Sequence, residues 1–160
     1  MKKIYIMLLT VMILLLSHVG VFAAPETLDA DVAGNSSGLV VVTKPQNQKD
    51  STFNQAYIIS GYGKEGTTVT LYWFDSSEGN YKKFYNETTY VDENGATQKM
   101  QTASEVKIGT SGLFMNTISL GQGENVILVR AENGEHVQLM KLSVTKYNYN
   151  IIDIIKSLTT

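Results

Sequence analysis

The first residues in this chain that could support chemistry form a glycine motif. Residues 61–66 (GYGKEG) have the G-x-G-x-x-G spacing of a dinucleotide-binding loop. In such a loop a helix must follow, with its N-terminus facing the pyrophosphate. The residues that follow, 67–72 (TTVTLY), are rich in β-branched side chains and favour a strand instead. The motif therefore predicts a tight hairpin between two strands, and we expect no cofactor.

A serine in a second glycine-rich stretch could act as a nucleophile. Residues 109–112 (GTSG) begin like a nucleophile elbow, but G-x-S-x-G requires a glycine where Leu113 stands. His136, the only histidine after the N-terminal segment, would have to serve as the base. Nothing in the sequence specifies the third group that orients such a base. We therefore expect no hydrolase and no catalytic residues.

Carboxylates gather mainly at the predicted turns, as in residues 75–80 (DSSEGN) and 92–95 (DENG). Paired acids can hydrolyse glycosides, and oxygen-rich loops can hold calcium. Both segments have the composition of hairpin turns, and neither has the alternating ligand spacing of a calcium loop. We expect turns here, and no metal site.

Aromatic residues are concentrated between residues 72 and 90. Exposed aromatic side chains on a β-sheet can form flat platforms for sugar rings, although strands favour aromatic residues in any case. Strand alternation places Trp73 on one face and its neighbours Tyr72 and Phe74 on the other. We therefore predict that Trp73 is buried. A carbohydrate- or cell-wall-binding platform would then consist of Tyr72, Phe74, Tyr81 and Tyr85.

From residue 39 onward, short β-rich runs alternate with turn residues, which is typical of an all-β sandwich or barrel. Asn-Gly pairs at 94–95 and 133–134 are strong signals for hairpins. Ile127 and Val129 alternate with other residues on one strand, so we expect both in the core. We expect strands at residues 39–44, 56–61, 67–74, 82–85, 88–91, 106–108, 113–120, 125–131 and 136–146.

Two stretches resemble bacterial immunoglobulin-like domains. Residues 111–131 contain SGLF, ISL, GENVI and VRA, similar to the pattern of the last strands of those domains. The earlier stretch 58–69, with IISG and GTTV, is similar to their second and third strands. The resemblance covers about residues 40–146 and implies an immunoglobulin-like antiparallel β-sandwich with no shared catalytic residues. Such modules serve as spacers, adhesion units and enzyme appendages. The chain departs from the pattern between residues 72 and 107.

The first 23 residues predict a signal peptide. Two lysines precede the apolar run 4–16, and Val21 and Ala23 are the small residues expected before cleavage after Ala23. The alternative is an uncleaved membrane anchor, because the run 4–24 is close to the roughly 20 residues of a membrane span. In either case we expect the domain outside the cytoplasm, secreted or at the cell surface.

The segments on either side of the predicted sandwich, residues 39–147, differ from it in composition. Residues 24–38 are polar, small and acidic, and predict a flexible linker. In the C-terminal tail, 148–160, five apolar residues follow the stripe of an amphipathic helix, and the isoleucines equally suit a short strand. Such a brief segment requires a partner surface. We expect this surface to be its own domain, with another protein or a membrane as alternatives.

Charge and cysteine content reduce the number of function classes that the chain could belong to. Removing the first 23 of 160 residues, and two lysines with them, leaves 11 basic and 15 acidic side chains, a net charge of −4. This mild acidity argues against nucleic-acid binding. The absence of cysteine excludes disulfides and thiol catalysis, and in an exported domain it is typical of a bacterial protein. We expect an exported, non-catalytic immunoglobulin-like module for protein contact or spacing at the cell surface. The alternative is a module that binds carbohydrate or cell wall through residues 72–90. A membrane is an expected partner only if the signal segment stays uncleaved.

Overall fold

The computed structural model describes residues 24–148. The predicted signal peptide and the tail from residue 149 onward lie outside the described residues. The described chain is all-β apart from one short 3-10 turn, η1. Its elements are β1 (Thr27–Asp29), β2 (Val40–Lys44), η1 (Gln46–Gln48), β3 (Lys49–Thr52), β4 (Ala56–Gly63), β5 (Thr68–Asp75), β6 (Asn80–Lys83), β7 (Tyr85–Val91), β8 (Thr97–Ala103), β9 (Glu105–Lys107), β10 (Leu113–Ser119), β11 (Gly123–Asn133) and β12 (His136–Lys146).

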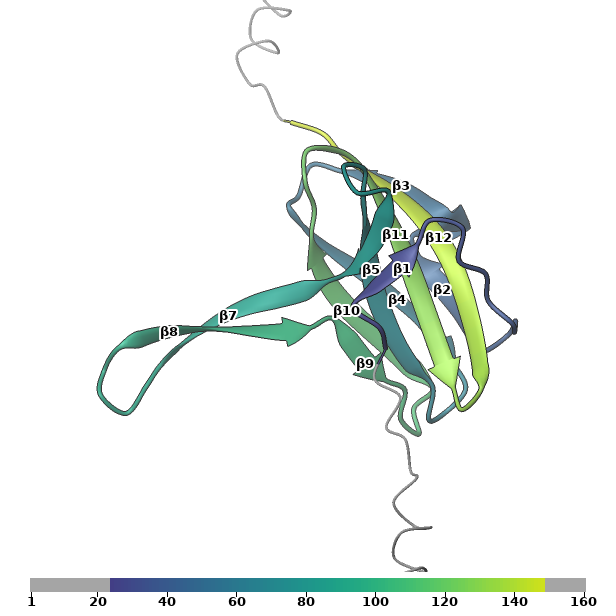
Figure 1. Cartoon of the computed structure of the whole chain (residues 1–160), viewed down its shortest axis with the longest axis horizontal. Helices are drawn as coiled ribbons and strands as arrows, with labels where there is room; N and C mark the ends of the chain where they lie inside the picture. Colours follow the sequence, from purple (N-terminus) through teal and green to yellow (C-terminus); the bar gives the residue numbers. More distant parts are fainter. Residues whose placement is uncertain (1–23, 149–160) are drawn as a thin grey trace, which may run out of the picture.

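Two sheets stack on each other, and a hairpin projects from them (Figure 1). The larger sheet has the strand order β1-β6-β5-β11-β12-β3, with β9 also paired to β5. The smaller sheet has the order β10-β4-β2, and β7 and β8 form the projecting hairpin. All described pairs are antiparallel except β3 with β12, which is parallel. The prediction of an all-β fold built from antiparallel sheets is confirmed.

The main core lies between the two sheets. Alternate residues of the strands on either side of it, such as β4 and β10, point inward, as period-two patterning predicts. Ile127 and Val129 of β11 are at most 1% exposed, so their predicted burial is confirmed. The smaller sheet contributes Ile59 and Phe114 to the same cluster. Burial of these side chains from both sheets holds the sandwich together, at about 1.5–3 kcal/mol for each large side chain.

A buried glutamine ties the smaller sheet to the larger one. The Gln138 Oε1 atom on β12 accepts hydrogen bonds from the backbone N–H groups of Leu39 and Val40, at 2.7 and 3.0 Å. Its Nε2 donates to the Val40 carbonyl at 3.0 Å. Gln138 is 9% exposed, so these bonds satisfy polar groups that water reaches poorly.

The N-terminal segment covers the outer face of the larger sheet. β1 pairs with β6, and Leu28 and Val32 pack on a second, smaller core formed by Tyr72, Tyr81 and Leu128. The prediction that residues 24–38 form a flexible linker is therefore wrong. The segment lacks apolar periodicity because only a few of its side chains enter this small core.

Candidate functional site

The outer face of the smaller sheet carries large apolar side chains that point to solvent. We call the following set the outer apolar face: Val41 (44% exposed), Ile58 (38%), Tyr62 (51%), Leu113 (64%) and Met115 (63%). Val41, Tyr62 and Leu113 lie directly opposite one another across β2, β4 and β10. Such cross-strand neighbours have Cβ atoms about 4.5–5.5 Å apart, so the three side chains form one continuous row.

At the outward strand positions of this face the described strands carry one charged residue, Lys44 at the end of β2, which lies opposite Ser60. The other outward residues are small or hydroxylic: Thr43, Ala56, Ser60, Thr117 and Ser119. A solvated sheet face normally alternates with the core and is polar. Apolar side chains grouped on an exposed surface mark sites of interaction with other molecules.

Two recesses deepen the outer apolar face at its sides. One, of about 230 Å³, is lined by Val41, Tyr62 and the residues that flank them, 38–40 and 63–64. The other, of about 420 Å³, lies beside Leu113 and Met115 and reaches Val106 of β9. These recesses give the face the concave relief that can hold side chains of a partner.

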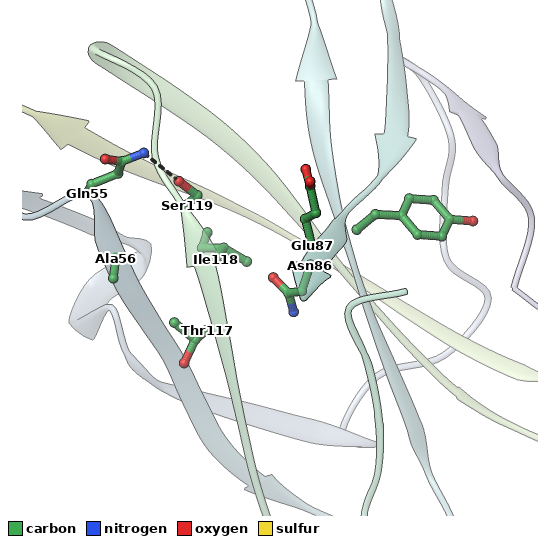
Figure 2. A pocket seen from close by; sticks show the side chains of 8 residues that line it. Gln55, Ala56, Asn86, Glu87, Thr117, Ile118 and Ser119 are labelled. Atoms are coloured by element: carbon green, nitrogen blue, oxygen red, sulfur yellow. Dashed lines mark hydrogen bonds between the residues drawn. The ribbon is translucent and has the colours of Figure 1, made fainter. Parts of the chain in front are cut away.

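A groove separates β10 from the base of the projecting hairpin, and we call it the β7–β10 groove. Its volume is about 670 Å³. Figure 2 shows Gln55 bonded to Ser119 on one wall, at 3.1 Å, and Asn86 and Glu87 on the other. Ile118 of β10 also lines it, although this side chain is only 1% exposed.

The β7–β8 hairpin extends away from the sandwich, and nearly all of its residues are exposed (Figure 1). An ion pair between Glu87 and Lys99 lies across the two strands. Tyr90 and Met100 are 51% and 52% exposed. At the tip, the Asp92 carboxylate accepts bonds from the Gln98 side chain and the backbone of Ala96, which lower the pKa of Asp92.

The four residues predicted as a sugar platform do not form an exposed row. Tyr72 and Tyr81 are 0% and 2% exposed, because the N-terminal segment covers them. Phe74 is half-buried against Tyr81, with ring centroids 5.1 Å apart. Tyr85 is exposed, and its hydroxyl donates to the Glu26 carboxylate.

The prediction that Trp73 is buried is wrong. Trp73 is 38% exposed, and it is not part of the main core cluster although it shares a strand face with Leu71. The Lys82 amine lies 5.8 Å from the centroid of its ring. Lys82 also bridges to Asp75 at 2.8 Å, and this bond holds the pKa of Asp75 far below its usual range.

The other sequence candidates lie in turns. Residues 61–66 end β4 and lead into β5 through a turn, with Gly66 at a φ of +81°. The predicted hairpin is wrong, because β4 and β5 belong to different sheets and the turn connects the two layers. The Ser111 hydroxyl accepts a hydrogen bond from the Leu113 backbone, and His136 begins β12 opposite Asn133. Within residues 24–148, no group of three or more His, Cys, Asp or Glu side chains could hold a metal ion.

Sequence reasoning missed the outer apolar face, although its signal is present. The strands that form it have apolar residues on both faces, as in Tyr57-Ile58-Ile59 and Leu113-Phe114-Met115. In each strand, one set of alternate residues fills the core. The apolar character of the other set, which faces outward, requires a separate explanation.

Comparison with protein-family models, curated proteins and solved structures finds no match to this chain. No helix among the described residues is long and apolar enough to cross a membrane. The surfaces of the molecule itself are therefore what indicates its function.

Proposed function

We propose that this chain is an exported, non-catalytic module of the immunoglobulin-like β-sandwich type that binds another protein at the cell surface. The outer apolar face is its contact surface. The observation that supports this function is the group of five large apolar side chains, between 38% and 64% exposed, on a sheet face whose one charged strand residue, Lys44, lies at the end of β2.

The energetics of the face favour contact over a role as a plain spacer. Burying apolar surface yields roughly 25 cal/mol for each Å² removed from water. Interface centres are depleted of charge and enriched in aromatic residues and methionine, as Tyr62 and Met115 exemplify here. A spacer would gain solubility from charged residues at these positions, because a bare apolar face promotes aggregation.

The N-terminal sequence supports a location of the module outside the cytoplasm. Two lysines, the apolar run and the small residues before Ala24 support export, with the domain secreted or held at the cell surface. An uncleaved segment would add a membrane contact. Because Tyr72 and Tyr81 are buried, no described observation favours the carbohydrate-binding alternative over protein contact.

Site-specific photocrosslinking on the producing cells tests this function. A photoreactive amino acid at Tyr62 should give discrete adducts with a surface protein or with a second copy of the chain. The variant Leu113→Glu/Met115→Glu should lose these adducts. A probe at Lys107, on the short strand β9 of the larger sheet, is the matched control and should give none.

Two results would contradict the proposed function. Adducts of equal strength from both probes would show that the face is not specific. Retention on purified cell wall or polysaccharide that survives Leu113→Glu/Met115→Glu, without any protein adduct, would favour the glycan-binding alternative.

A further inference from the structure

The β7–β8 hairpin has two long strand edges that no other described strand covers. Each strand has seven residues, and within residues 24–148 β7 and β8 pair only with each other. The pairing keeps one register along its whole length, and neither strand contains proline or glycine. Natural proteins shorten, bend or cover such edges, because the unpaired backbone N–H and C=O groups can pair with another strand. Uncovered edges of this length therefore indicate a partner strand.

Of the two edges, that of β8 is the free one. Three consecutive residues at the base of β7, Tyr85, Asn86 and Glu87, line the β7–β10 groove. Consecutive residues of a strand point to opposite faces, so a groove lined by all three runs along the edge of β7. β8 pairs with the other edge of β7 and contributes no residue to this groove. The outer edge of β8 therefore lies on the side of the hairpin away from the groove.

Hydrogen bonds at the two ends of the hairpin show which backbone groups of β8 point outward. The Ser104 N–H donates to the Phe84 carbonyl at 2.7 Å, and the Asp92 N–H donates to the Ala96 carbonyl at 2.9 Å. Hydrogen-bonded and non-hydrogen-bonded pairs alternate along antiparallel strands, so the pairs with even residue numbers are the bonded ones. The remaining residues of β8 direct their N–H and C=O groups away from β7: Thr97, Lys99, Gln101 and Ala103.

The two charged residues of the hairpin strands lie on one face and are paired. Glu87 and Lys99 form an ion pair across the strands, so the charge of Lys99 is already neutralised within its own hairpin. The opposite face has no charged residue: Asn86, Thr88, Tyr90, Gln98, Met100 and Thr102. A further strand beside β8 would therefore extend one uncharged face and one face with balanced charge.

The sequence of β8 is complementary to itself about its central residue, Met100. When two β8 strands lie antiparallel with Met100 opposite Met100, Lys99 lies opposite Gln101 of the other strand. No like charges then stand opposite each other, which would destabilise the pair. Lys99 and Gln101 both direct their backbone groups outward, so each such pair can exchange two hydrogen bonds. This match favours a second copy of the chain as the partner.

We propose that the outer edge of β8 binds β8 of a second copy of this chain, so that the two hairpins form one four-stranded antiparallel sheet centred on Met100. The two Met100 residues form a non-hydrogen-bonded pair, in which side chains come closest. The uncharged faces of both hairpins, with Tyr90 and Met100, lie on the same side of this sheet. The dimer uses a surface separate from the outer apolar face, so the inference stands apart from the proposed function.

Sedimentation of the chain purified from the producing cells tests the dimer. The parent chain should form a dimer that dissociates on dilution. Gln101→Pro removes an N–H that points away from β7, so it should weaken dimerisation by about tenfold or more while the hairpin stays paired. Thr89→Pro removes an outward N–H from the edge of β7 instead. It is the matched control and should dimerise like the parent chain.

Introduced cysteines test the register, because the chain itself contains none. Met100→Cys should form a disulfide-linked dimer in air, since the two central residues would have Cα atoms about 4.5 Å apart. Thr88→Cys is the control, because Thr88 lies opposite Met100 on the same uncharged face. Its two copies would be three strand spacings apart, about 14 Å, and should not link.

Three results would overturn the proposal. A parent chain that stays monomeric at every concentration would show that β8 does not pair with a second copy. Equal dimerisation of the two proline variants, or equal disulfide formation by the two cysteine variants, would show that the edge of β8 is not the contact. A dimer that survives Gln101→Pro and is lost in Leu113→Glu/Met115→Glu would assign the association to the outer apolar face, in agreement with the proposed function alone.

Discussion

At the scale of single residues, Gln138 shows how one polar side chain can fix the junction of the two sheets. Its amide makes three bonds to the backbone of Leu39 and Val40, at the point where the chain enters β2. No apolar side chain could replace these bonds, because two N–H groups and one carbonyl would lose their partners in a buried place.

We therefore expect Gln138→Ala to destabilise the domain by about 1–3 kcal/mol, the cost of leaving buried backbone groups unsatisfied. Urea denaturation would measure this as a lower midpoint with an unchanged slope. Gln122→Ala, at an exposed position, is the matched control and should change the free energy of unfolding by less than about 0.5 kcal/mol. A loss as small for Gln138→Ala as for the control would contradict this account.

The N-terminal segment is held by a clamp of three side chains. The Lys83 amine, 8% exposed, donates to the Ala24 carbonyl at 2.6 Å and to Glu26 at 3.0 Å. The Tyr85 hydroxyl donates to the other oxygen of Glu26, and these bonds lower the pKa of Glu26 from its ordinary value of 4.5. The stability that Glu26 adds is therefore present above pH 4.5 and is lost as the pH falls through its lowered pKa.

Acid should thus release residues 24–29 before the sandwich unfolds. NMR signals of Thr27 and Leu28 should shift toward disordered values below pH 4.5 while signals of β11 stay in place. Lys83→Met should remove much of this pH dependence, because the segment is then already weakly held at neutral pH. Its neighbour Lys82→Met is the control, since Lys82 bonds Asp75 and Glu78 instead. Identical titrations of the two variants would contradict the clamp.

At the scale of elements, the β7–β8 hairpin depends on its turn. A two-stranded hairpin with no third strand is at best marginally stable in water. Its turn places Gly95 at a φ of +79°, a conformation that glycine adopts without strain. The Asp92 carboxylate bonds the turn backbone at Asn94 and Ala96.

We expect Gly95→Ala to weaken the hairpin by about 1 kcal/mol, which is enough to unpair much of it. Hydrogen exchange in residues 85–103 should become faster while the main core keeps its protection. Gly109→Ala is the matched control, because a Cβ at Gly109 meets no atom within 4 Å and its φ is not positive. Equal exchange of the hairpin in both variants would contradict this dependence on Gly95.

The comparison of predicted and observed elements shows what local pattern can reveal. Strong alternation located the strands of the main core, and the Asn-Gly pairs located both hairpin turns. β1, β3 and β8 were missed because they are short or polar, and their pairing comes from distant partners such as β6 and β12. Alternation also could not reveal which sheet face another segment covers. For this reason Tyr72 was assigned to a surface that residues 24–38 bury.

At the scale of the whole molecule, the two outer faces of the sandwich differ in whether a described segment of the chain covers them. The outer face of the larger sheet is apolar and is covered by the chain's own N-terminal segment, which buries Tyr72, Tyr81 and Leu128. The outer face of the smaller sheet is apolar as well, and within the described residues no segment covers it. This asymmetry supports a contact surface on the smaller sheet, because a face that served only folding would be covered or charged.

The same asymmetry predicts different roles for neighbouring residues of β10. Residues that face outward should serve contact with a partner, and residues that face the core should stabilise the fold. Leu113→Lys/Met115→Lys should change the free energy of unfolding by less than about 0.5 kcal/mol for each substitution, because both side chains already face water. Phe114→Ala, between them, should cost about 3–5 kcal/mol, because Phe114 is 3% exposed in the main core. Urea denaturation measures both changes, and binding of a hydrophobic dye to the folded protein should fall only in the lysine variant. A large loss of stability in that variant would show that Leu113 and Met115 stabilise the fold. This result would contradict the proposal that the outer apolar face is a binding surface.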